Sequence, residues 1–127
     1  MELQVGVKAL LKNKEGKYLL VRRSSEKYPE VGAMWDIVGG RIKAGSPLFD
    51  NLKREVKEEV NLQFKVTKLF STGKWKDREL YRFLGDWKGE VKIQEEELLE
   101  WNWFTYNEAI KLDLSFDYRK VIEDHKS

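Results

Sequence analysis

Short runs rich in apolar and β-branched residues recur along the chain, separated by polar stretches that contain Gly, Pro, Asn or Asp. Such runs predict β-strands at residues 4–11, 17–23, 34–38, 64–70, 79–87 and 100–105. The polar residues 13–16 predict a turn between the first two runs, which are therefore expected to form a β-hairpin. Loops are expected from Gly40 to about Gly45 and around Gly73.

A helical period replaces this pattern after residue 45. Ser46 followed by Pro47 predicts a helix start, with the Ser46 hydroxyl as the N-cap and Pro47 in the first helical position. Asn61 fits the helix end because Asn tolerates the left-handed conformation. At 100° per residue, one stripe is apolar and is expected to face the core; it contains Phe49, Leu52, Val56 and Val60.

Two further helices are predicted near residues 107–112 and 115–124. Strands interrupted by one strong central helix, with helices again at the end, indicate an α+β or α/β sandwich. The length of 127 residues and the 41% hydrophobic content predict a single domain over residues 1–127.

The composition excludes several classes of protein and of chemical site. No run approaches the roughly 18 apolar residues of a membrane span, and the first twenty residues do not resemble a secretory signal. The absence of cysteine excludes disulfides, thiolate metal sites and a cysteine nucleophile, and makes the cytoplasm the default location. A net charge of +2 gives no support for a membrane or a stable nucleic-acid partner.

Three carboxylates, those of Glu55, Glu58 and Glu59, are expected on one flank of the central helix, beside its apolar stripe. Like charges so close raise one another's pKa, and a cation among them makes the arrangement favourable. Oxygen ligands in a chain whose single histidine is His125 favour Mg²⁺ or Mn²⁺ over Zn²⁺. The simpler alternative is a solvated charged face, balanced by an ion pair between Arg54 and Glu58.

The residues around these carboxylates resemble the Nudix box, here at residues 40–62. The box pattern is Gly, five residues, Glu, seven residues, Arg-Glu, an aliphatic residue, any residue, Glu-Glu, any residue, Gly and an aliphatic residue. The matching residues are Gly40, Arg54, Glu55, Val56, Glu58, Glu59 and Leu62. The resemblance continues through LLVRR, MWDIVGG and EEELLEWNWF, over about residues 3–112. It implies an α/β fold of the Nudix type, an α/β/α sandwich with a central mixed sheet.

The resemblance also implies site residues. It assigns the metal to the carbonyl of Gly39 and the side chains of Glu55, Glu58, Glu59 and Glu97. Arg54 is the box arginine, and Glu97, with Glu96 as the second choice, is the additional acid, which acts as ligand or general base. On the substrate side the candidates are Arg23 for a phosphate, Trp35, Asp36 and Tyr118, with Asp117 as an alternative to Tyr118.

Two fixed box positions differ from the pattern. Ser46 stands where the box has a Glu that helps to hold the arginine, which leaves Arg54 to pair with Glu58 or another acid. Asn61 stands where the box has Gly, a mild change because Asn adopts a left-handed conformation. The first difference is expected to weaken metal binding without abolishing it.

The function implied is Mg²⁺-dependent hydrolysis of a phosphoanhydride in a nucleoside diphosphate linked to another group. The small MutT-like form favours a nucleoside triphosphate, cleaved to a monophosphate and pyrophosphate. Dinucleoside polyphosphates, ADP-ribose and RNA 5′ ends are alternatives, as is a Nudix-fold module that binds nucleotides without catalysis. Members of the family often form homodimers, and the resemblance leaves that open here.

Overall fold

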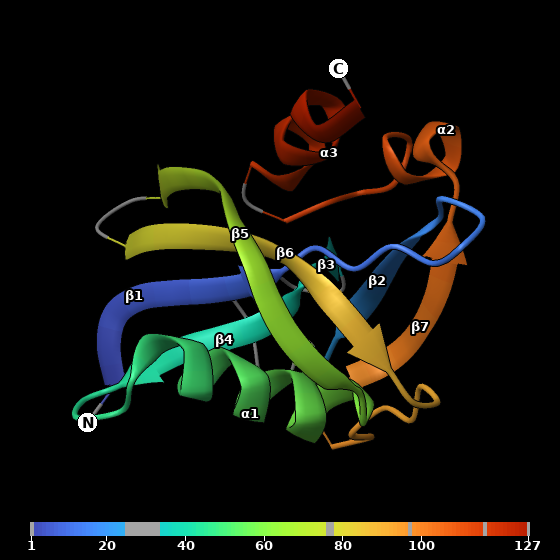
Figure 1. Ribbon diagram of the computed structural model, residues 1–127. Helices are drawn as coiled ribbons and strands as arrows, with labels where there is room; N and C mark the ends of the chain where they lie inside the picture. Colours follow the sequence, from blue (N-terminus) through green and yellow to red (C-terminus); the bar gives the residue numbers. More distant parts are fainter. Residues whose placement is uncertain (1, 25–33, 76–77, 97, 116, 127) are drawn as a thin grey trace. The chain divides into compact units, whose positions relative to one another are not determined.

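The computed structural model describes residues 2–24, 34–75, 78–96, 98–115 and 117–126. The chain forms two compact units, one from residues 2–11 and 38–92 and the other from residues 12–37 and 93–126. Figure 1 shows the elements of both units. Within the described residues, none of the helices has both the length and the apolar character that a membrane crossing requires.

The first unit is a four-stranded mixed sheet covered by one helix. The sheet contains β1 (Glu2–Ala9), β4 (Val38–Lys43), β5 (Gln63–Trp75) and β6 (Arg78–Lys88), in the order β4-β1-β6-β5. β1 runs antiparallel to β4 and parallel to β6, and β5 runs antiparallel to β6. Helix α1 (Leu48–Val60) packs on β4, β5 and β1.

The core of this unit lies between α1 and the sheet, and Figure 1 shows α1 running along β4. Leu52, Val56 and Val60 are fully buried on the helix, as the apolar stripe predicts. Phe49 was expected on the same stripe, but it is 56% exposed and contacts Phe83 edge-on, with 5.5 Å between ring centroids. Phe49 lies in the first turn of α1, where it stays more than half exposed.

The second unit is an antiparallel sheet with two short helices. The sheet contains β3 (Trp35–Asp36), β2 (Tyr18–Arg23) and β7 (Leu98–Phe104) in that order. Helix α2 (Tyr106–Ala109) contacts β7 and α3 (Tyr118–Lys126). Thr105 begins α2 with a reciprocal capping box, in which its hydroxyl accepts the N–H of Glu108.

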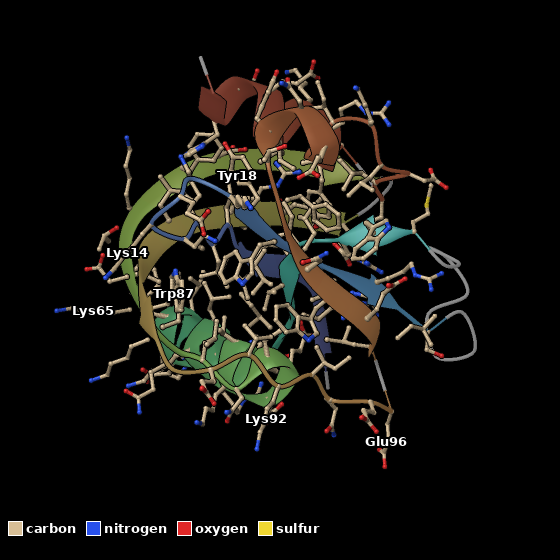
Figure 2. The ribbon with its side chains drawn as sticks, turned by 90° about the vertical axis from the view of Figure 1, so that its right-hand side faces the viewer. Lys14, Tyr18, Lys65, Trp87, Lys92 and Glu96 are labelled. Carbon is tan, nitrogen blue, oxygen red and sulfur yellow. The ribbon has the colours of Figure 1, made fainter. Side chains whose placement is uncertain are left out.

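Tyr18 at the start of β2 is buried, and its hydroxyl lies 2.9 Å from Nδ1 of His125 in α3 (Figure 2). Burial raises the pKa of this tyrosine, with a further contribution from Tyr106. The contact ties α3 to the sheet of the second unit.

The structure corrects several predictions. The first two strands do not form a hairpin, because β1 pairs with β4 and β6 whereas β2 pairs with β3 and β7. The turn between them is present, with the N–H of Gly16 bonded to the carbonyl of Asn13, but its strands join different sheets. Local turn chemistry therefore does not determine which strands pair.

Element ends also differ from the prediction. Ser46 does not cap α1; Pro47 is the N-cap and no side chain caps the helix there. Asn61 does end the helix in the left-handed conformation, with φ 66°. The Gly39–Gly40 pair lies inside β4 instead of opening a loop, and Gly73 lies inside β5 instead of forming a turn.

Candidate functional site

Two glycines of β4 allow the backbone to approach the helix carboxylates. Gly39 has φ 141°, and a Cβ there would lie 2.1 Å from the carbonyl oxygen of Val7, so no other residue fits. A Cβ on Gly40 would lie 2.7 Å from Oε2 of Glu55. The absence of side chains at both positions therefore places a strand backbone directly against a carboxylate of α1.

Glu59 and Glu55 face this backbone from α1. Glu59 is 2% exposed, and its Oε1 accepts the N–H of Gly39 at 3.1 Å. The side chain of Glu55 is 15% exposed. Burial raises the pKa of Glu55 above its ordinary value, the negative charges of Glu59 and Glu58 raise it further, and Arg54 and Lys8 oppose the rise. The crowding of carboxylates expected from the helix spacing is thus present between Glu55 and Glu59.

Glu58 points instead to Arg54. Nη1 of Arg54 donates to both carboxylate oxygens of Glu58 at 3.1 Å. The Glu58 side chain is 58% exposed, so this ion pair lies at the surface. The Arg54–Glu58 pair of the simpler alternative is therefore present, while Glu55 and Glu59 are too buried to belong to a solvated face.

Arg54 has two further partners besides Glu58. Its Nη2 donates at 3.2 Å to Oε1 of Glu55 and at 3.2 Å to Oδ1 of Asn51. Asn51 is fully buried, and its Nδ2 donates to the carbonyl of Arg41 at 3.3 Å. Asn51 was not expected at the site, although a polar residue between apolar helix positions was the available signal.

Lys8 is a second residue that sequence reasoning missed. It lies in β1 directly opposite Gly39, is 6% exposed, and its Nζ donates to the Gly39 carbonyl at 3.4 Å. Its ammonium also lowers the pKa of Glu55 through an electrostatic interaction with that carboxylate. A lysine within an apolar strand was the signal. We refer to Lys8, Gly39, Gly40, Glu55 and Glu59 together as the box cluster.

The box cluster offers ligands of the kind that a hard divalent cation requires. Carboxylate oxygens of Glu55 and Glu59 and the carbonyl of Gly39 are all oxygen donors, and Gly40 leaves room beside Glu55. Across the part of the chain that the structure describes, no group of three His, Cys, Asp or Glu side chains is arranged to hold a metal ion. The donor chemistry fits Mg²⁺ or Mn²⁺, and the third carboxylate, Glu58, is engaged by Arg54.

The second unit contains Arg23 and Asp36 as a buried ion pair. Nε of Arg23 donates to Oδ2 of Asp36 at 2.5 Å, and their side chains are 4% and 2% exposed. Asp36 also accepts the N–H of Ile37 at 2.7 Å, and Nη2 of Arg23 donates to the Ile37 carbonyl at 3.4 Å. These contacts join β2 to the segment after β3. A phosphate contact for Arg23 stays a prediction, but this guanidinium has a structural role.

Arg22 lies on the other face of β2, as strand alternation predicts. Its Nε is 2.6 Å from Oε1 of Glu100, and its side chain is 33% exposed. The two neighbouring arginines therefore differ in burial and in partner, which makes them a matched pair for experiments.

The remaining substrate-side candidates have diverse surroundings. Trp35 is partly buried against Phe104, with 4.9 Å between ring centroids. Tyr118 is fully buried at the start of α3, whereas Glu96 is exposed (Figure 2). Glu97 lies outside the described residues. The structure therefore groups Gly39, Glu55 and Glu59 in the first unit, and it groups Arg23 with Asp36 in the second.

Comparison with known proteins shows the family to which the chain belongs. The model of the NUDIX domain matches residues 2–125, and the chain belongs to this family, that of the Nudix hydrolases. The chain is 32% identical over 101 residues to a NAD-capped RNA hydrolase, NudC, of Mannheimia succiniciproducens. That match covers 75% of the chain but only 38% of the relative, so the chain spans less than half of its length.

A shorter relative and a solved structure complete the comparison. An 8-oxo-dGTP diphosphatase of Buchnera aphidicola is 34% identical over 91 residues, which cover 69% of the chain and 68% of the relative. The crystal structure of a MutT protein from Methanosarcina mazei superposes with a TM-score of 0.80 and 23% identity, covering 96% of the chain and 91% of that protein. The expected fold class, a Nudix-type α/β/α sandwich with a central mixed sheet, is thereby confirmed.

Proposed function

We propose that the protein hydrolyses a phosphoanhydride bond in a nucleoside diphosphate linked to another group, with Mg²⁺ as cofactor and Mn²⁺ as a substitute. The favoured substrate is a nucleoside triphosphate, cleaved to a nucleoside monophosphate and pyrophosphate. The observation that carries the proposal is the buried approach of Glu55 and Glu59 to the Gly39–Gly40 backbone inside a Nudix box.

In this proposal the chain's own groups position the metal and the water. Glu55, Glu58 and Glu59, with the Gly39 carbonyl and Glu97, hold the cation. The bound cation would neutralise charge on the diphosphate oxygens. Arg54 orients Glu58 through two hydrogen bonds and Glu55 through one, so it keeps the acidic side chains in place. Glu55 and Glu97 are the two candidates for accepting a proton from the attacking water.

Retention of two buried carboxylates supports an enzyme over a module that only binds nucleotides. Burial raises the pKa of Glu55, which means that the ionised carboxylate is unfavourable in the folded protein without a cation. Such a cost is typical of functional sites. A purely structural helix would place an apolar side chain at this largely buried position.

A substrate panel with product masses tests the proposal. Purified protein is incubated with Mg²⁺ and, separately, a deoxynucleoside triphosphate, NAD, ADP-ribose and a dinucleoside polyphosphate. We expect release of pyrophosphate and a nucleoside monophosphate from the triphosphate, and loss of this activity with a chelator. Asp50→Asn, an exposed change on the same helix, is the matched control for substitutions in the box. Nucleotide binding without any product would contradict hydrolysis and support the binding module.

A second candidate substrate is NAD or a NAD-linked RNA end. The relative of Mannheimia succiniciproducens is named a NAD-capped RNA hydrolase, and its identity of 32% is close to that of the diphosphatase relative. NAD contains the same diphosphate linkage between two groups, so the same box chemistry would cleave it. Faster release of nicotinamide mononucleotide from NAD than of pyrophosphate from every triphosphate would make this the preferred function.

A further inference from the structure

Lys8 is a buried cation that the proposed reaction does not use. It lies in the middle of β1, between β4 and β6, where its neighbours in register are Gly39 and Arg82. A buried ammonium is unfavourable unless opposite charge or polar groups surround it. Its Nζ donates to the Gly39 carbonyl, and its charge lowers the pKa of Glu55.

These partners are the ones that the proposed metal site needs. The Gly39 carbonyl accepts from Lys8 while the N–H of the same residue donates to Glu59. Gly39 therefore links the ammonium to the Glu59 carboxylate, and Glu55 lies beside the next residue, Gly40. Lys8 also lies tightly against this segment, because a Cβ on Gly39 would be 2.9 Å from Cδ of Lys8.

We propose that Lys8 is an internal counter-cation that competes with the divalent metal for the box cluster and so sets its metal affinity. Without metal, its ammonium compensates part of the negative charge of Glu55 and Glu59 and binds the Gly39 carbonyl. When a divalent cation binds the same carbonyl and carboxylates, the ammonium gives up that hydrogen bond and repels the ion. This inference rests on the proposed function, since it assumes that the metal binds the box cluster.

The competition has two consequences of opposite sign. Removal of the Lys8 charge eliminates a repulsion, so Mn²⁺ should bind at least about tenfold more tightly, the effect expected for one unit charge near a divalent ion in a partly buried site. The same change removes one of the cations near Glu55, beside which only Arg54 then remains of the two, so the metal-free protein should melt at a lower temperature. A residue that only filled space would change stability without changing metal affinity.

The test compares Lys8→Met with the wild type and with Lys65→Met. Methionine keeps most of the aliphatic length of lysine, and Lys65 is an exposed lysine of β5 that points away from the chain (Figure 2). Mn²⁺ affinity is measured by isothermal titration calorimetry and the melting temperature is measured with and without Mn²⁺. We expect Lys8→Met to bind Mn²⁺ about tenfold more tightly, to melt several degrees lower without metal, and to approach the wild type with metal. Lys65→Met should match the wild type in both.

Two results would overturn the inference. Unchanged or weaker Mn²⁺ binding by folded Lys8→Met would show that the ammonium does not compete with the ion. If Lys8→Met does not fold, Lys8→Gln replaces it, because glutamine can still donate to the Gly39 carbonyl without a charge. Failure of both variants to fold even with Mn²⁺ would also overturn it, since a metal should replace the lost cation. Absence of Mn²⁺ binding by the wild type would instead contradict the proposed function itself.

Discussion

Two buried groups of charged side chains, one in each unit, are built differently. In the second unit, Arg23 and Asp36 form one cation and one anion in direct contact, both at least 96% buried at the side chain. In the box cluster, one ammonium, that of Lys8, accompanies the two carboxylates of Glu55 and Glu59. The first group pairs one cation with one anion, whereas the second brings two carboxylates together, with Arg54 as well as Lys8 supplying positive charge beside Glu55.

This difference separates a structural role from a functional one. A balanced buried pair with satisfied hydrogen bonds holds β2 and the segment after β3 together and needs no ligand. A buried carboxylate beside a second one, such as Glu55 beside Glu59, is unfavourable to ionise, and proteins retain such groups where a reaction requires them. Substitutions should therefore affect stability in the first group and activity in the second.

The largest effect is expected from Arg23→Ala. It leaves Asp36 buried without its cation, which should lower the free energy of unfolding by about 3–5 kcal/mol. Urea denaturation followed by circular dichroism measures the loss. Arg22→Ala, which breaks the half-exposed pair with Glu100, is the matched control and should cost less than about 1 kcal/mol. Similar losses in both variants would show that the burial of Arg23 does not distinguish it.

Unlike Arg23→Ala, Glu58→Gln and Glu59→Gln should reduce activity and retain the fold. Each keeps the shape of the side chain and removes a proposed ligand charge, so kcat should fall by about 10²-fold or more while the fold is retained. Steady-state kinetics and melting temperature on the same samples separate the two effects, with Asp50→Asn as the control on α1. Activity within threefold of the wild type in both variants would exclude the proposed metal ligands.

Glu55→Gln should stabilise the metal-free protein while it reduces activity. The pKa of Glu55 is raised in the folded state from an ordinary value of 4.5, so ionisation favours the unfolded chain above the folded pKa. The gain in melting temperature should therefore be complete at neutral pH and should disappear as the pH falls through the folded pKa to below 4.5. A gain that does not depend on pH would assign the effect to packing.

The smallest effect is expected from Ser46→Glu, which restores the box residue. Arg54 already has Asn51, Glu55 and Glu58 as partners, so the added carboxylate should tighten Mg²⁺ binding by only a few-fold through its charge. No capping hydrogen bond is lost, because Ser46 does not cap α1. Ser46→Glu is also tested in an Asn51→Ala background. There the new glutamate should tighten Mg²⁺ binding by a larger factor, because Asn51 no longer holds Arg54. Equal effects in the two backgrounds would show that Asn51 does not substitute for it.

Local chemistry explains which elements the sequence predicted well. The apolar period of α1 and its end at Asn61 depend on neighbouring residues, and both are present. The pairing of β1 with β4 and β6 depends on partners distant in sequence, and the expected hairpin was wrong for that reason. Phe49 shows that the helical period is also insufficient within α1. The period of apolar residues predicts which face of a helix is buried, but not how deeply a residue at the helix end is buried.

The candidate site residues were predicted from a motif, which specifies residue types at fixed spacings. Glu55 and Glu59 lie against the Gly39–Gly40 backbone, and their role as metal ligands stays a prediction. Lys8 was missed because its position opposite Gly39 follows from strand register, which no local pattern encodes. Asn51 was missed because its role depends on the absence of a glutamate at position 46 and on the carbonyl of Arg41.

The parallel pairing of β1 with β6 has a consequence for synthesis of the protein on the ribosome. Val5 pairs with Glu79, so β1 is synthesised about 70 residues before this partner, whereas α1 and β4 are near neighbours in the chain. Until β6 is synthesised, the edge of the apolar strand β1 that will pair with β6 stays open. Open strand edges promote aggregation of nascent chains. Slow translation of the β5 and β6 codons would prolong this exposure, and chaperones that shield strand edges would act in that interval.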